Sequence, residues 1–401
     1  MRRRLFHGIA IAAAGVTVIG GIAGCGAVDQ LSAKQKVSKA MSSLEDADSA
    51  SFTFRLDTTT SDIAAIAKAN NDSLSANDRK VLGQVIAGDI EYAVHAADGK
   101  KLSDSLNAFK QIPDAEALLK DPQKFGAYLK QAGDFQIAVH LSGDSLVELR
   151  LKDGVIYGRA AVPKIMELTG QDSTQIDSQL ASLPANLAPI RKAAHGEWVS
   201  VDLTALMQSL KNSRALDQLP ATATPSVDAG AVQKLLTDLR AAYEQKVTIK
   251  ELGDSDRGTQ YQLSASAKQV AAAVQDDVIK IAGDAAASDI RKSIAEIPDL
   301  PVNVNVWVKD DELTGISFDV AQFIDNKPAG AKLAVDVAVD VDSGDIEKPS
   351  GATPLDVRAL MNEVGASLSG AGASASGSGF SEGFGDDSRD LGGEPAISDD
   401  F

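Results

Sequence analysis

Apolar and polar residues alternate with a period of two in several segments of this chain. The most regular segment runs from Leu333 to Val341, where every second residue is leucine or valine and the residues between are alanine or aspartate. This period indicates β-strands with one apolar and one polar face. Such strands are typical of antiparallel sheets, because parallel sheets are buried on both faces. The other segments that share the pattern are 52–56, 90–94, 135–141, 147–151, 247–249, 261–265, 302–308 and 316–320.

Short turn signals join neighbouring segments into hairpins. Asp153 and Gly154 stand between the apolar runs 147–151 and 155–157. An Asp-Gly pair in this position is a strong hairpin signal, because glycine tolerates the positive φ that the turn requires. Similar turns are predicted at 142–144, 253–258 and 310–311, so consecutive strands are expected to pair with each other.

Apolar residues at helical spacing occupy segments between the strands. One stripe consists of Val232, Leu235, Leu236, Leu239 and Tyr243. Their spacing places them on a single face of a helix. Comparable stripes lie at 270–281 and 290–297, and less regular ones at 35–44, 61–86 and 115–132. We therefore predict an α+β fold with about ten or eleven antiparallel strands and helices over one face of the sheet.

The N-terminus has the layout of a secretory signal peptide. Three arginines at positions 2–4 precede an apolar run from about Ile9 to Ile22. The run is shorter than the ~20 apolar residues that span a bilayer comfortably. It ends in Ile22-Ala23-Gly24-Cys25, which resembles the lipobox of bacterial lipoproteins. We therefore predict a signal peptide over 1–24 and a diacylglyceryl group on Cys25; the sequence fits both general and twin-arginine export.

Composition divides the remaining chain. Residues 25–34 are predicted to be a lipidated tether, residues 35–350 the folded domain and residues 351–365 a terminal helix. The proline-containing stretch 213–230 marks either a subdivision or a long surface loop. From 366 to 401 the chain is rich in Gly, Ser and acidic residues, so this tail is predicted to be disordered.

Charge and cysteine content narrow the function. The formal net charge is −17, which disfavours nucleic-acid binding because few cations can replace the counterions of phosphate. No polybasic patch adds membrane affinity, so the Cys25 lipid is the expected membrane anchor. Cys25 is also the only cysteine. The domain must therefore be stabilised by burial of its core without a disulfide.

Residues with catalytic or metal-binding chemistry form no known pattern in the sequence. His95, His140 and His195 do not fall at a metal-ligand spacing. The sequence contains no P-loop and no dinucleotide fingerprint. We predict a protein that is not an enzyme and that uses no cofactor and no metal.

Several short motifs together resemble one protein family. They are 153–159 (DGVIYGR), 196–202 (GEWVSVD), 313–318 (LTGISF) and the Lys348-Pro349 pair, placed behind a lipobox and the early strand 50–54. This arrangement resembles the LolA-like lipoproteins of actinobacteria, the LppX/LprG group. The resemblance implies a curved half-barrel sheet, with helices over its concave face and an apolar cavity for acylated lipids. It also implies a role in moving lipids or lipoproteins through the envelope.

Two functions fit these observations. In the first, the half-barrel binds a lipid or another apolar ligand, for envelope lipid trafficking. The predicted lining is then Phe52, Phe54, Phe135, Ile137, Val139, Val304 and Val306. In the alternative, the core is solid and the tethered domain docks an envelope partner through its acidic surface or tail. The partner protein is not identified by the sequence.

Overall fold

The computed structural model of the chain describes residues 30–110, 121–168, 170–212 and 234–358, apart from 236–237, 239–240, 242–244, 284–285, 298 and 325. The predicted signal peptide, Cys25, the stretch 213–230 and the tail 366–401 lie outside the described residues. Among the helices that are described, none has both the length and the apolar character needed to cross a bilayer.

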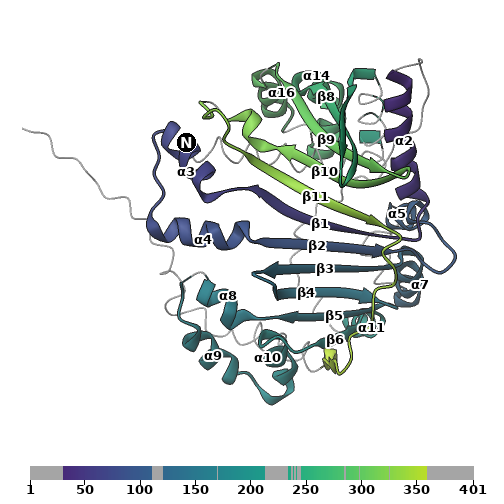
Figure 1. The fold of residues 1–401 in the computed structure, drawn as a ribbon. Coiled ribbons are helices and arrows are strands. Elements are labelled where there is room, and N and C mark those ends of the chain that lie inside the picture. Colours follow the sequence, from purple (N-terminus) through teal and green to yellow (C-terminus); the bar gives the residue numbers. More distant parts are fainter. Residues whose placement is uncertain are drawn as a thin grey trace, which may run out of the picture.

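A single curved, open sheet of 12 strands organises the fold (Figure 1). Its order is β12-β6-β5-β4-β3-β2-β1-β11-β10-β9-β8-β7, so β12 and β7 are the edges. The α+β class is confirmed, with slightly more strands than predicted. The strands are β1 (Ser49–Thr58), β2 (Gly88–His95), β3 (Asp134–Leu141), β4 (Asp144–Lys152), β5 (Val155–Ala160), β6 (Val199–Asp202), β7 (Thr248–Ser255), β8 (Gly258–Ser266), β9 (Pro301–Lys309), β10 (Glu312–Asp319), β11 (Leu333–Val341) and β12 (Thr353–Pro354).

Strand pairing collects the alternating apolar residues on one face. Phe52 of β1 lies opposite Val339 on one side and Tyr92 on the other, and Tyr92 in turn lies opposite Ile137. Directly opposite residues point to the same side of a sheet. The apolar face therefore continues without interruption from β11 through β1 and β2 to β3.

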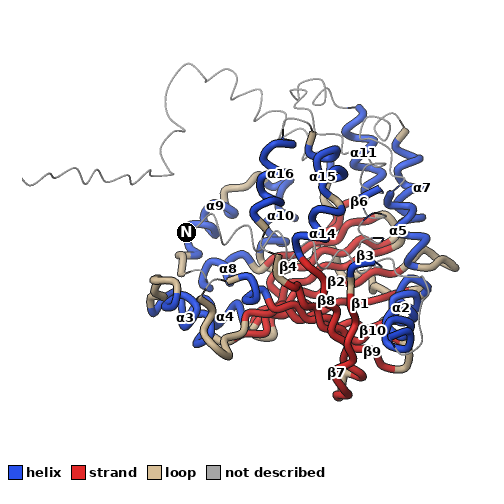
Figure 2. The backbone as a smooth tube through the Cα atoms, turned by 90° about the horizontal axis from the view of Figure 1, so that it is seen from above, coloured by secondary structure: helices blue, strands red, loops and turns tan. Residues whose placement is uncertain are grey.

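Helices gather on the concave, apolar side of this sheet, as predicted (Figure 2). Helix α2 covers the strands near β10, whereas α10 contacts β5 and β6. The helices are α2 (Gln30–Asp46), α3 (Thr60–Ala69), α4 (Ala76–Ile86), α5 (Leu102–Lys110), α7 (Pro122–Ala132), α8 (Val162–Leu168), α9 (Ser173–Ala181), α10 (Ala188–Ala194), α11 (Leu203–Asn212), α14 (Ala267–Ala273), α15 (Gln275–Ala282) and α16 (Ala287–Glu296), with 3-10 turns η1 (Ala185–Leu187) and η3 (Val320–Phe323).

Three predicted boundaries differ from the structure. The helical stretch 61–86 is two helices, because Ser75 and Asp78 form a capping box that starts α4 anew. Residues 30–34 of the predicted tether already belong to α2. The predicted terminal helix begins only at 357, since residues 353–354 pair with β6 as β12, the one parallel pairing in the described sheet.

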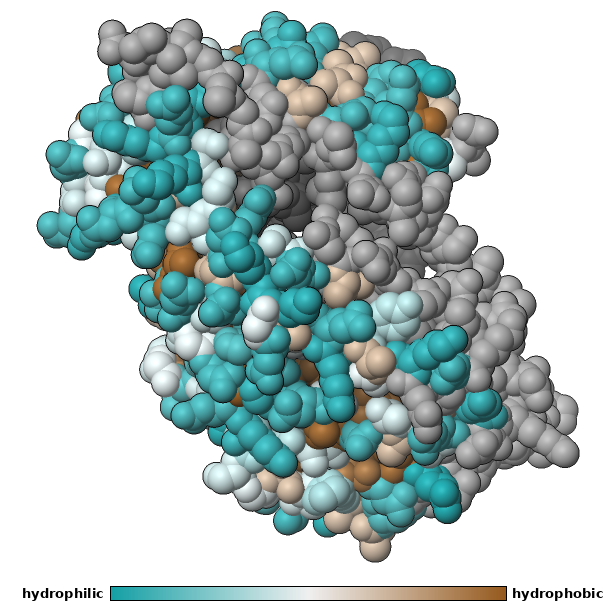
Figure 3. Space-filling model, turned by 90° about the vertical axis from the view of Figure 1, so that its right-hand side faces the viewer, coloured by the Kyte–Doolittle hydropathy of each residue, from teal (hydrophilic) through white to brown (hydrophobic). Residues whose placement is uncertain are grey.

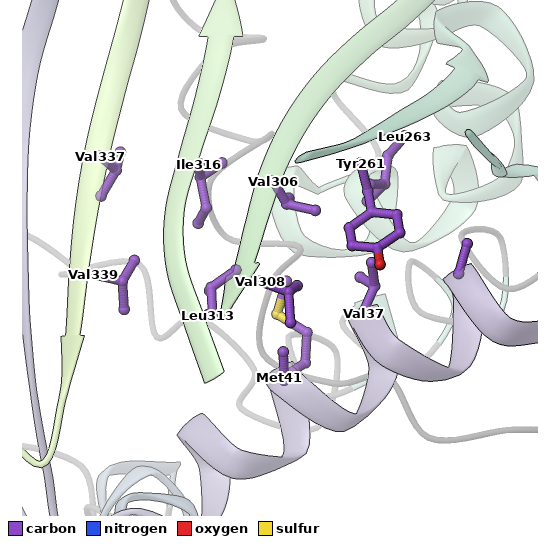
Figure 4. Close-up of a cluster of buried hydrophobic side chains, with 12 residues drawn as sticks. Val37, Met41, Tyr261, Leu263, Val306, Val308, Leu313, Ile316, Val337 and Val339 are labelled. Atoms are coloured by element: carbon purple, nitrogen blue, oxygen red, sulfur yellow. The ribbon is translucent and has the colours of Figure 1, made fainter. Parts of the chain in front are cut away.

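The main hydrophobic core lies between α2 and the strands β8 to β11 (Figure 4). Val37 and Met41 of α2 are fully buried against Val306, Val308 and neighbouring side chains. Burial of an aliphatic side chain of this size stabilises the fold by about 1.5–3 kcal/mol. This half of the apolar face is therefore filled by the protein itself.

A strap, residues 342–352, crosses the opposite face of the sheet. It leaves β11 where the Asp342 amide donates to the Ser49 carbonyl at 2.8 Å, and it leads into β12 beside β6. Between these points the Arg150 guanidinium donates to the Glu347 carbonyl at 2.9 Å. Because Arg150 alternates with the apolar residues Leu149 and Leu151, this contact places the strap on the polar, convex face.

Candidate functional site

The predicted ligand-lining residues fall into two groups in the structure. Phe52, Phe54, Val304 and Val306 belong to the half of the apolar face under α2. Val306 is only 1% exposed, and the other three pack against the same cluster. These four side chains are therefore part of the filled core in this structure.

The remaining predicted residues, Phe135, Ile137 and Val139, lie on β3 beyond the reach of that core cluster. Ile137 is 37% exposed, and on the neighbouring strands Ile90 is 47% and Val147 38% exposed. Val139 lies opposite both Ile90 and Val147. We name Ile90, Ile137, Val139 and Val147 the apolar patch.

Ile90 and Val147 were not among the predicted lining residues, although both lie in predicted strands. Their alternation with polar neighbours is the same as that of buried Val306. The register supplies the missing information, because it places them beside Val139 on three consecutive strands. Grouped apolar side chains left exposed on a folded protein are a mark of ligand or partner binding.

The apolar patch and the side chains around it form a hydrocarbon surface. On this face, every position of β2 from 90 to 94, of β3 from 135 to 141 and of β4 from 147 to 151 carries an aliphatic or aromatic side chain. The Tyr92 hydroxyl is the one polar group among them, and burial raises its pKa. Such a surface can bind an apolar chain through burial, whereas it offers little to orient a charged headgroup.

The polar face carries a cluster of charged residues beside the strap. Glu148 is 6% exposed and accepts from Arg150 at 3.1 Å and from Arg159. Both guanidinium groups lie over the Trp198 ring, at 5.0 and 4.8 Å from its centre. Burial alone would raise the pKa of Glu148, but its interactions with Ser145, Arg159 and Arg150 together outweigh burial and lower it. The cluster joins β4, β5 and the start of β6.

Three possible metal ligands also meet on this face, which the sequence did not predict. His95, Asp134 and Asp345 offer ligand atoms within 4.8 Å of one another. The Lys152 ammonium lies among them, 2.8 Å from Asp134 and 3.1 Å from Asp345. Burial would lower the pKa of Lys152, but the two carboxylates outweigh it and raise the pKa. An internal cation thus takes the place that a metal ion would need.

A hollow of about 1050 Å³ lies beside this cluster, between α5, α7 and the ends of β3 and β4. Its wall mixes alanines with charged residues such as Lys100, Asp104 and Lys130. Figure 3 views the molecule from this end, where the described surface is mostly hydrophilic and apolar residues form only small separate groups. The hollow therefore differs in chemistry from the apolar patch.

Comparison with known proteins does not assign a function to this chain. The sequence matches no known family model, and no curated protein matches it. Among solved structures it is similar to the Mycobacterium tuberculosis lipoprotein LppX, with a TM-score of 0.27 and 7% identity, over 78% of this chain and 97% of that chain. A likeness of this size does not assign the chain to that protein's family.

Proposed function

We propose that this protein is a lipoprotein of the cell envelope that is anchored through Cys25 and binds the acyl chain of a lipid on its apolar patch. The lipobox-like end of the N-terminal segment supports the anchor. The concave, helix-flanked sheet supports the binding function. Its task would be to hold lipids during transport through the envelope, without chemical conversion of the ligand.

The observation that carries this proposal is the contrast between the two halves of one apolar face. Under α2, Val306 is 1% exposed, whereas Val147, in the same alternating pattern, is 38% exposed. A solid core would bury both. The sheet continues its apolar face across β2, β3 and β4, where Ile90, Ile137 and Val147 remain 47%, 37% and 38% exposed.

The energetics favour an apolar chain as the ligand. Full burial of an Ile or Val side chain contributes about 1.5–3 kcal/mol, so covering the exposed parts of three such side chains contributes roughly 2–4 kcal/mol. Each ligand CH₂ group that leaves water adds about 0.8 kcal/mol. Affinity is therefore expected to rise with chain length and to depend little on the headgroup.

Native mass spectrometry of residues 26–401, purified without detergent, tests the proposal. We expect an added mass that organic solvent removes and that matches a lipid. Ile137→Asp should abolish this mass, because it places a carboxylate on the binding face. Leu252→Asp is the matched control, since Leu252 on β7 is 43% exposed outside the patch, and it should keep the lipid.

A protein that neither carries nor takes up lipid would contradict the proposal. The alternative would then be a tethered interaction protein with a solid core. Deletion of residues 366–401 separates the two functions further. Lipid binding should survive this deletion, whereas a partner that docks on the tail should be lost.

A further inference from the structure

Helix α4 stands at the margin of the apolar patch and buries none of its own residues completely. Its neighbour α3, in contrast, buries Ile66 against Ala321 and Ala331. Val81, Leu82 and Ile86 of α4 are half-buried, whereas Val85 is 47% exposed. α4 is thus an amphipathic helix that the core does not fully use.

The position of Gly88 shows that the C-terminal end of α4 lies on the concave side. Gly88 starts β2 and shares the face of Ile90, two residues further on. A Cβ atom at Gly88 would lie 2.7 Å from the Leu141 side chain and 3.3 Å from the Val85 carbonyl. The backbone of α4 at Val85 therefore borders the same face as the patch. Among the described residues, six large apolar side chains are exposed, and four of them, Val85, Ile90, Ile137 and Val147, belong to this region.

The charge of α4 differs from that of the whole protein. The formal net charge is −17, yet Arg79 and Lys80 are exposed on α4, and neither forms an ion pair with another residue that the structure describes. Lys80 and Arg79 precede the exposed Val85 by five and six residues, about one and a half turns, and α4 carries one acidic residue, Asp78, against these two cations. Cations that flank an exposed apolar residue are typical of a helix that lies in a membrane interface. Anionic headgroups attract such cations.

We propose that α4 docks on an anionic bilayer surface and places the patch where a lipid can pass between membrane and protein. This inference rests on the proposed lipid-binding function, and it assigns the membrane contact to Val85, Arg79 and Lys80. In Figure 1, α4 lies at one end of the sheet beside β1 and β2. The patch and the contact are adjacent, so one orientation on the membrane serves both.

An environment-sensitive fluorophore at position 85 tests the contact. The lipidated full chain carrying Val85→Cys is reconstituted in phosphatidylcholine vesicles with or without phosphatidylglycerol. Cys25 is the only natural cysteine and carries the lipid, so position 85 offers the one free thiol. We expect a blue shift and quenching by lipids that carry a shallow nitroxide, stronger with phosphatidylglycerol. Labels at Asn77→Cys and Leu252→Cys serve as controls and should stay water-exposed.

The cations are tested in the same assay. Arg79→Gln with Lys80→Gln should reduce the ratio of docked to undocked label about 20- to 30-fold, since each cation at an anionic surface contributes roughly a factor of five. High salt should have a similar effect. The double variant should still carry its lipid in native mass spectrometry, because neither residue belongs to the patch.

The outcomes distinguish the two proposals. A label at position 85 that is quenched no more than the label at 252 would overturn the docking, even if lipid copurifies. Quenching at 85 in a protein without lipid uptake would support the docking and contradict the carrier function. A blue shift that needs no vesicles and grows with protein concentration would mean that α4 contacts a second copy, and would also overturn the docking.

Discussion

Val147→Ala and Val306→Ala remove the same two methyl groups from two positions of one apolar face. At Val306, which is 1% exposed, the lost transfer free energy is about 1.6 kcal/mol, at about 0.8 kcal/mol for each carbon. The cavity left behind adds up to about 1 kcal/mol, because the core under α2 relaxes only in part. We expect Val306→Ala to lower the free energy of unfolding by about 2–3 kcal/mol.

Val147 is 38% exposed, so its methyl groups are already partly in water. The transfer term falls to about 1 kcal/mol, and no closed cavity is formed. In ligand-free protein, Val147→Ala should therefore cost about 1 kcal/mol. A bound acyl chain would bury the Val147 side chain and remove the difference in exposure between Val147 and Val306. With saturating ligand the cost of Val147→Ala should rise, whereas that of Val306→Ala should stay constant.

Urea unfolding followed by the fluorescence of Trp198 and Trp307 measures both variants, with and without lipid. Equal costs in the delipidated protein would show that Val147 is packed like Val306, and would refute the exposed patch. A ligand that stabilises wild type and Val147→Ala to the same degree would place its binding elsewhere. The two variants share one chemistry, so differences in side-chain type cannot explain a positive result.

Four further changes test other parts of the structure. Cys25→Ala should release the protein from the membrane fraction and remove the acyl mass. Gly315→Ala should lower the free energy of unfolding by about 1–3 kcal/mol, because a Cβ at this position overlaps the Arg257 guanidinium. That guanidinium binds Asp336 and stacks on Trp307, so the cost should shrink in an Arg257→Ala background. Lys152→Met should speed amide exchange in 343–350, whereas Lys164→Met, which alters the ion pair with Asp144, should not. Glu148 has a lowered pKa, so its ionised carboxylate stabilises the fold fully above the ordinary pKa of about 4.3, and this stabilisation is lost as the pH falls through the lowered pKa. Glu148→Gln should therefore flatten the acid side of a stability–pH profile.

The strands were predictable because alternation and turns agree along the chain. Segment 302–308 and its partner across Asp310 and Asp311 form β9 and β10 as predicted. β12 was not predicted, since two residues carry no period and depend on the edge of β6 for their pairing. The division between α3 and α4 could have been found, because Ser75 followed by Asp78 is a helix-start signal.

The candidate site was predictable only in part. Periodicity indicates which face of a strand is apolar, and it did so for Ile137 and Val306 alike. Whether a helix covers that face depends on contacts between distant segments, such as Met41 of α2 with the strands β8 to β11. Local sequence does not encode those contacts. The same reason explains why Lys152, Asp134 and Asp345 were not expected to meet.

The strap limits how tightly this open sheet can curl. Its path from β1 to β6 crosses five strand spacings of about 4.8 Å, roughly 24 Å, along the outer side of the curve. Tighter curling lengthens an outer path and flattening shortens it. Residues 342–353 could extend to about 38 Å, but attachment to Arg150 and Lys152 and burial of Ile346 divide the strap into short spans. It therefore resists tighter curling of the half-barrel, so the width of the concave face is limited by contacts on the opposite side of the sheet.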